Sequence, residues 1–124
     1  MIKKSILLIE DNRDIRNGLM LRLANSGYFV FPAENGEMGL ETARQKDLDL
    51  IILDLMLPGM CGEALCKTIR EDSDKRFATI PIIMLTAKNS DVDQVIGRVI
   101  GADIYLTKPY DVNRLLSEVA RLTA

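Results

Sequence analysis

Three carboxylates, one hydroxyl and one ammonium are the side chains of this sequence whose types and positions could do chemistry together. Each stands at the end of a short apolar run or directly after it: Glu10, Asp11, Asp54, Thr86 and Lys108. Carboxylates held close together repel one another and gain protons unless a cation intervenes. Oxygen ligands without histidine or cysteine favour a hard cation, and a site that keeps room for water favours Mg²⁺ over Ca²⁺.

A site of this composition is suited to phosphoryl transfer. A Mg²⁺ ion beside a lysine and a hydroxyl can stabilise a phosphoryl group while it is being transferred. A carboxylate that faces this group can act as the nucleophile and form an acyl phosphate. Asp54 suits that role, because it is the one charged residue in the apolar stretch 51–59, where a carboxylate needs a partner.

The elements that must position these side chains follow from hydrophobic patterning. Five apolar runs are expected to be strands, at residues 6–9, 28–31, 50–53, 82–85 and 104–107. Runs one, three and four show no polar alternation, which is typical of parallel strands buried on both faces. Right-handed crossovers then predict an α/β fold, a single doubly wound (βα)₅ parallel five-stranded sheet with helices on both sides.

Helices are expected between the strands and after the last one. Asn12 can cap the first helix, which stops at Gly27, and Asn35 can cap a second helix from Gly36 to about Lys46. Three further helices are expected to contain residues 65–69, 92–100 and 112–122. The polar segment 71–76 is expected to be a loop, and Pro32 is expected to end the second strand.

The strand order decides where the polar side chains meet. Parallel sheets of this class bind ligands at the carboxyl ends of their strands, beside the switch point of the strand order. In the order 2-1-3-4-5, strands one, three, four and five are consecutive neighbours. The three acids, the hydroxyl and the lysine are therefore expected to converge at one edge of the sheet.

Composition excludes several other classes of function. A net charge of −2 and a pI near 5.1 give no electrostatic case for binding nucleic acid. No apolar run approaches the roughly 18 residues of a membrane span. The chain has no histidine, which excludes a Ser-His-Asp triad, a histidine metal site and a phosphohistidine carrier. Cys61 and Cys66 fit no metal framework, and a reducing, cytoplasmic setting is expected.

Four motifs, in order, resemble one known family. They are the acidic pair in LLIEDN, LDLMLPGMCG around Asp54, MLTA at the end of the fourth strand, and GADIYLTKPY at the end of the fifth. With them the chain resembles a response-regulator receiver domain of two-component signalling, flavodoxin-like in fold, as in chemotaxis regulators. The resemblance covers essentially the whole chain, residues 1–124, as one domain.

The resemblance implies a role for each acid. Asp54 would be the phosphoacceptor, taking a phosphoryl group from a histidine kinase or a phosphotransfer protein. Asp54 and Asp11 would bind Mg²⁺, Glu10 would bind it directly or through water, and Met56 would contribute its backbone carbonyl. The protein would catalyse its own phosphorylation and, slowly, its own dephosphorylation.

The resemblance also implies a switch. Thr86 would hydrogen-bond the phosphoryl group, and Lys108 would pair with its oxygens through a turn in which the Lys108–Pro109 bond is cis. Thr86 and the aromatic ring of Tyr105 would move together on phosphorylation. The segment 91–122, from the fourth helix to the fifth, would then present an altered surface to a downstream effector protein or output domain.

One departure from the family pattern and one property of the residues that flank the site qualify these expectations. Ile104 stands where many DNA-binding members carry a second acid used in dimer contacts, which weakens the case for a phosphorylation-dependent dimer and leaves it open. Met56 and Lys88, two residues beyond Asp54 and Thr86, are not suited to orienting an attacking water. A long-lived phosphoryl form is therefore predicted.

Three alternatives are weaker on the residues themselves. A Mg²⁺-dependent phosphohydrolase of similar fold needs a general acid two residues after its nucleophile, where Met56 cannot serve. A nucleotide- or flavin-binding module needs a Gly/Ser/Thr-rich loop after the first strand, where this chain has Glu10 and Asp11. A pseudo-receiver that binds partners without phosphorylation would not need the complete set of five site residues.

Overall fold

Five parallel strands form one sheet in the computed structural model, which describes residues 3–55, 57, 59–86 and 101–124. Each strand is parallel to its neighbours. Across the sheet the order is β2 (Phe29–Ala33), β1 (Ser5–Ile9), β3 (Leu50–Asp54), β4 (Ile82–Thr86) and β5 (Ile104–Thr107). This arrangement confirms the doubly wound sheet of order 2-1-3-4-5.

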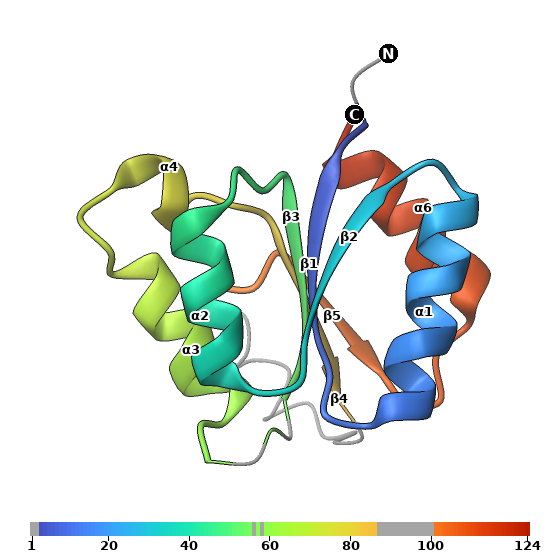
Figure 1. The fold of residues 1–124 in the computed structure, drawn as a ribbon, viewed down its shortest axis with the longest axis horizontal. Helices are drawn as coiled ribbons and strands as arrows, with labels where there is room; N and C mark the ends of the chain where they lie inside the picture. The colour runs from blue at the N-terminus through green and yellow to red at the C-terminus, as the bar shows by residue number, and fades with distance from the viewer. Residues whose placement is uncertain (1–2, 56, 58, 87–100) are drawn as a thin grey trace.

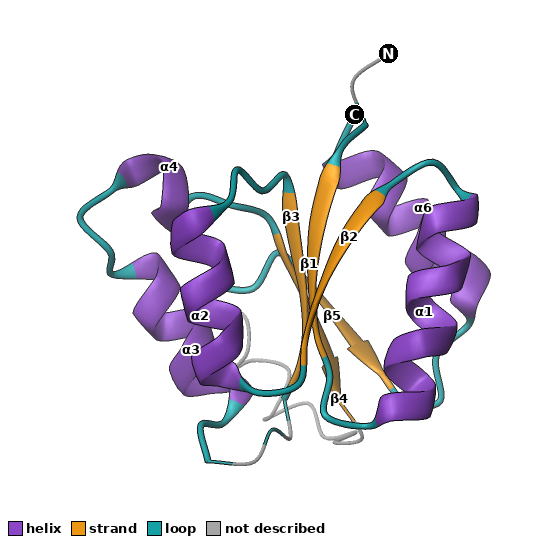
Figure 2. Ribbon diagram, in the orientation of Figure 1, coloured by secondary structure: helices purple, strands orange, loops and turns teal. Residues whose placement is uncertain are grey.

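Helices cover both faces of the sheet, as Figures 1 and 2 show. On one face lie α1 (Arg13–Asn25) and α6 (Val112–Leu122); on the other lie α2 (Gly36–Gln45), α3 (Gly62–Arg70) and the short α4 (Lys75–Ala78). The helix expected at 92–100 falls outside the described residues. Within the described ranges, no helix is both long enough and apolar enough to cross a membrane.

Two apolar layers hold the helices to the sheet. Along β1, Leu7 and Ile9 belong to the core layer under α2 and α3, whereas Ile6 and Leu8 belong to the layer under α1 and α6. All residues of β3 and β4 are buried, which is why those strands carry apolar side chains at successive positions. Each such Leu or Ile contributes about 1.5–3 kcal/mol of burial free energy, so the sheet is a rigid platform for whatever its strand ends carry.

The predicted helix caps are present. The Asn12 side chain accepts a hydrogen bond from the Ile15 backbone N–H at 3.0 Å, and Asn35 accepts one from the Met38 N–H at 2.8 Å. Each cap satisfies a backbone donor that the first turn of a helix leaves without a partner. Gly27 follows the end of α1 with a φ of 96°, a conformation that favours glycine.

Two predicted boundaries were wrong. The second strand does not stop at Pro32 but runs on to Ala33. It can do so because β2 is an edge strand, where a residue without an N–H group is tolerated. The segment 71–76 is not entirely loop either, since Asp74 caps α4 by accepting from the Arg76 N–H, and Phe77 in that helix is buried in the core.

Candidate functional site

The carboxyl ends of four neighbouring strands bring the predicted side chains together. Asp54 is the last residue of β3 and Thr86 is the last residue of β4. Glu10 and Asp11 follow β1 directly, and Lys108 follows β5. The convergence expected from the strand order therefore holds for all five positions. Met56 and Lys88 lie outside the described residues.

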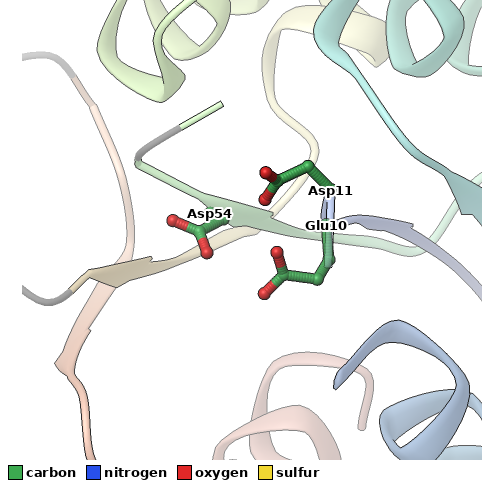
Figure 3. A group of neighbouring side chains, drawn as sticks. All are labelled: Glu10, Asp11 and Asp54. Carbon is green, nitrogen blue, oxygen red and sulfur yellow. The ribbon is translucent and has the colours of Figure 1, made fainter. Parts of the chain in front are cut away.

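The three acids form one cluster. One carboxylate oxygen from each of Glu10, Asp11 and Asp54 lies within 4.8 Å of the others. Figure 3 shows the Asp54 side chain at the end of its strand and the Glu10 and Asp11 side chains extending from the end of β1 on the same side. Glu10 and Asp54 are only 1% and 3% exposed, whereas Asp11 is open to solvent. The cluster thus has two buried acids and one at its mouth.

This donor set fits Mg²⁺. All three side chains offer oxygen, the ligand atom that Mg²⁺ prefers, and Mg²⁺ binds oxygen at about 2.1 Å, so opposite ligands stand about 4.2 Å apart. The three carboxylate oxygens lie within 4.8 Å of one another and would draw closer around an ion, because at most one pair of them can be opposite. The exposed side at Asp11 leaves room for the waters that Mg²⁺ usually keeps. The cluster could therefore hold this ion.

Lys108 is the cation that the structure itself places in the cluster. Its ammonium group forms an ion pair with Asp54 and lies 3.4 Å from Glu10 Oε1. Burial alone would lower the pKa of Lys108, but the hydrogen bond and charge of Asp54, helped by the charge of Glu10, outweigh burial and raise it. Lys108 is therefore firmly protonated and balances one of the three acids.

Burial and crowding of the acids raise the pKa of Glu10. Burial is the largest cause that raises its pKa to about 7, and the hydrogen bond with the Asp11 side chain and the charge of Asp54 raise it further. The Asn12 backbone N–H and the charge of Lys108 lower it. The Asn12 N–H donates to Glu10 Oε2 at 3.1 Å. Without a further cation, Glu10 thus holds a proton more readily than an ordinary carboxylate, as expected for a crowded group of acids.

Different residues cap α1 and supply the acids of the cluster. Because Asn12 caps α1, neither acid before it is needed for that purpose. The Glu10 backbone N–H donates to the Ala33 carbonyl at 3.0 Å, so the loop after β1 is tied to β2. The acid pair is therefore held between the end of a buried strand and the first turn of a helix.

Thr86 and Tyr105 are placed on the same face of the sheet. Tyr105 pairs in register with Met84, and Thr86 lies two residues beyond Met84 on β4. Thr86 is fully buried, and the Tyr105 ring packs against the core layer under α2 and α3. The Tyr105 hydroxyl is buried without a hydrogen-bond partner in the described part of the chain. The Lys108–Pro109 peptide bond is cis, the geometry that the resemblance implied.

Sequence reasoning missed two residues that shape this site. A side chain at Gly62 would place its Cβ 2.6 Å from the Asp54 carbonyl oxygen, so glycine is what lets α3 begin against the end of β3. The signal was present in the sequence as a glycine eight residues after the central acid, but only the packing gives it meaning. The second is Arg16, whose side chain reaches the loop after β1.

Comparisons with known proteins agree with this geometry. The model of the response regulator receiver domain family matches residues 6–120. The transcriptional regulatory protein AfsQ1 of Streptomyces coelicolor is 48% identical over 105 residues, which are 85% of this chain and 44% of that protein. Regulatory protein VanR of Enterococcus faecium is 43% identical over 119 residues, 96% of this chain and 48% of VanR. The chain thus spans less than half the length of these relatives.

Solved structures show the same architecture. Chemotaxis response regulator CheY4 of Vibrio cholerae superposes with a TM-score of 0.89 at 30% identity, covering 98% of this chain and 99% of that one. The receiver domain of the Francisella response regulator 1452 gives a TM-score of 0.90 at 27% identity, covering 98% and 97%. Together with the family match and the acid cluster at the strand ends, these likenesses show that the chain belongs to the response regulator receiver domains of two-component signalling.

Proposed function

We propose that the chain accepts a phosphoryl group on Asp54 from a histidine kinase or a histidine phosphotransfer protein, in a reaction that depends on Mg²⁺. The observation that carries the proposal is the placement of Asp54. It is a nearly buried carboxylate at the end of a rigid core strand, paired with Lys108 and grouped with two further acids. A carboxylate held in this way is oriented toward one reacting atom rather than free to rotate.

The chain's own residues divide the work of the transfer. An Asp54 carboxylate oxygen attacks phosphorus, the bond from phosphorus to the donor's nitrogen or oxygen breaks, and the bonding electrons leave with the donor. Lys108, already beside Asp54, neutralises the oxygens of the transferred group, and the Thr86 hydroxyl donates to one of them. Mg²⁺ bound by Glu10 and Asp11 together with Asp54 would supply the remaining charge stabilisation.

The switch follows from the same geometry. A phosphoryl group adds negative charge and acceptor oxygens at the end of β3. Thr86 moving toward that group leaves space on the face of the sheet that it shares with Tyr105. Movement of the Tyr105 ring into that space then alters the surface around β5 and α6. The names of relatives such as the transcriptional regulatory protein AfsQ1 favour an output domain that controls transcription as the partner of this surface, despite Ile104.

Intact mass after incubation with a small phosphoryl donor tests the proposal. Acetyl phosphate supplies a phosphorus–oxygen bond and phosphoramidate supplies a phosphorus–nitrogen bond like that of phosphohistidine. We expect one added phosphoryl group with either donor when Mg²⁺ is present and none when Mg²⁺ is chelated. The adduct should be removed by hydroxylamine, which cleaves acyl phosphates and leaves phosphoesters of serine or threonine intact.

Matched variants assign the position. Asp54→Asn should accept no phosphoryl group, whereas Asp47→Asn, which removes an exposed carboxylate on the loop before β3, should behave as the wild type. An adduct that persists in Asp54→Asn, or that resists hydroxylamine, contradicts the assignment to Asp54. Absence of any adduct from both donors and from a partner kinase would favour a pseudo-receiver.

A further inference from the structure

Arg16 reaches back from α1 to the loop that carries two of the three acids. Its Nη1 atom donates a hydrogen bond to the Glu10 carbonyl oxygen at 2.8 Å and lies 3.4 Å from the Asp11 carbonyl oxygen. Both contacts are to the backbone. Among the described residues, Arg16 makes no ion pair with a carboxylate. Arg16 therefore contacts the backbone of the two acids and forms no ion pair with either carboxylate in the described ranges.

The contact restrains the part of the site that is otherwise easiest to distort. Asp54 is anchored within a fully buried strand, whereas Glu10 and Asp11 stand on a loop between β1 and the cap of α1. Mutual repulsion of the acids favours turning this loop away from Asp54. The Glu10 N–H is already bound to Ala33, and Arg16 restrains the same residue through its carbonyl. Hydrogen bonds from charged donors are stronger than those between neutral groups.

We propose that Arg16 is a positioning residue for the metal site, holding the Glu10–Asp11 backbone so that the two carboxylates stay directed toward Asp54. The proposal rests on the proposed function in one respect, since it takes the acid cluster to bind Mg²⁺. Residues that orient metal ligands in this way affect metal affinity without touching the metal.

The direction in which loss of Arg16 changes Mg²⁺ affinity distinguishes a positioning role from a purely electrostatic one. A positive charge near the cluster repels Mg²⁺, so removal of the charge alone would tighten binding. Loss of a restraint on the two ligands would weaken binding instead. Arg13 gives a matched control, because it lies on the same helix, is exposed, and makes no contact with the acid pair among the described residues.

The test is a Mg²⁺ titration of the ¹⁵N-labelled chain followed by backbone amide shifts. We expect Arg16→Gln to raise the Mg²⁺ dissociation constant about tenfold, Arg13→Gln to leave it unchanged or slightly lower, and Arg16→Lys to give an intermediate value because lysine keeps one charged donor. The Mg²⁺ concentration that half-saturates phosphorylation by acetyl phosphate should shift by the same factor as the dissociation constant.

Each outcome decides the proposal. A dissociation constant for Arg16→Gln equal to or below the wild-type value overturns it, as does a tenfold rise shared by Arg13→Gln. If Arg16→Gln loses its dispersed amide spectrum, Arg16→Lys decides, and wild-type affinity in that variant overturns the proposal. A wild-type chain that binds Mg²⁺ but takes no phosphoryl group refutes the proposed function and leaves the role of Arg16 to the titration. Failure of the wild type to bind Mg²⁺ overturns both.

Discussion

At the amino ends of β4 and β5, one arginine is surrounded by acceptors, while at the carboxyl ends three acids share one lysine. Arg70 donates to the carbonyls of Ala78, Ile80 and Gly101 at 2.6–2.9 Å, and to the Asp103 carboxylate at 2.9 Å. One positive charge meets one negative charge, and three further contacts are made with backbone oxygens. We call these five residues the Arg70 hub.

The acid cluster lacks that balance. Among the described residues, Glu10, Asp11 and Asp54 face one ammonium, that of Lys108, and burial together with the neighbouring acids raises the pKa of Glu10. The hub pairs its own positive and negative charges, so it stabilises the fold without any ligand. The cluster could hold an added cation. The comparison teaches that a candidate binding site can be recognised where the folded chain crowds like charges together.

Removal of the hub's central cation should have the largest effect on stability. Arg70→Met puts a shorter, uncharged side chain in this place and removes the Arg70 donors from three carbonyls and from the Asp103 carboxylate. We expect a loss of about 3 kcal/mol in the free energy of unfolding, measured by urea denaturation. Arg76→Met is the control, because its ion pair with Asp47 is largely exposed and worth under about 1 kcal/mol. Equal losses in both variants would contradict the distinction.

Removal of an acid from the cluster should change stability in the opposite direction. The pKa of Glu10 is about 7 in the folded chain and near 4.5 in the unfolded chain. Its contribution is therefore fully favourable below pH 4.5 and is lost as the pH rises through about 7. In the absence of Mg²⁺, Glu10→Gln should stabilise the chain by about 2 kcal/mol at pH 8 and by nearly nothing at pH 4.5.

The measurement for Glu10 is urea denaturation at several pH values with a chelator present. Glu41→Gln, which removes an exposed carboxylate on α2, should show no such difference from the wild type. A stability gain for Glu10→Gln that is the same at pH 4.5 and pH 8 would show that ionisation of Glu10 is not its cause.

Replacement of an acid by its amide in the hub should lower stability, but by less than Arg70→Met does. The Asp103 carboxylate accepts from Arg70 and from the Ile82 backbone N–H, and asparagine keeps one oxygen for these donors. Asp103→Asn should therefore cost about 1 kcal/mol, because the side chain is partly exposed and only its charge is removed. Thermal denaturation at pH 8 would compare it with Glu10→Gln. A gain in stability for Asp103→Asn would remove the contrast between the two regions.

The residues of the candidate site could be predicted from the sequence more completely than the residues that hold them in place. Apolar runs in the sequence identify the strands, and parallel order places Asp54, Thr86 and Lys108 at neighbouring strand ends. Asn12 and Asn35 were predictable as caps, because a cap acts within a few residues of itself. Arg16 was not, since its partner atoms are backbone carbonyls that any sequence carries. The hub was hidden for the same reason, as Arg70 and Asp103 are 33 residues apart and three of four acceptors are carbonyls.

The errors at Pro32 and at the segment 71–76 have the same origin. Local preference disfavours a strand through proline and a helix in a polar segment, but the edge position of β2 and the burial of Phe77 overrode it. The sequence by itself determined where the strands lie along the chain and which chemical groups stand at their ends. Both depend on side-chain character and short-range periodicity. Only the tertiary structure decided which charges are balanced and which are not, because that balance depends on distances between residues far apart along the chain and on the water that packing excludes.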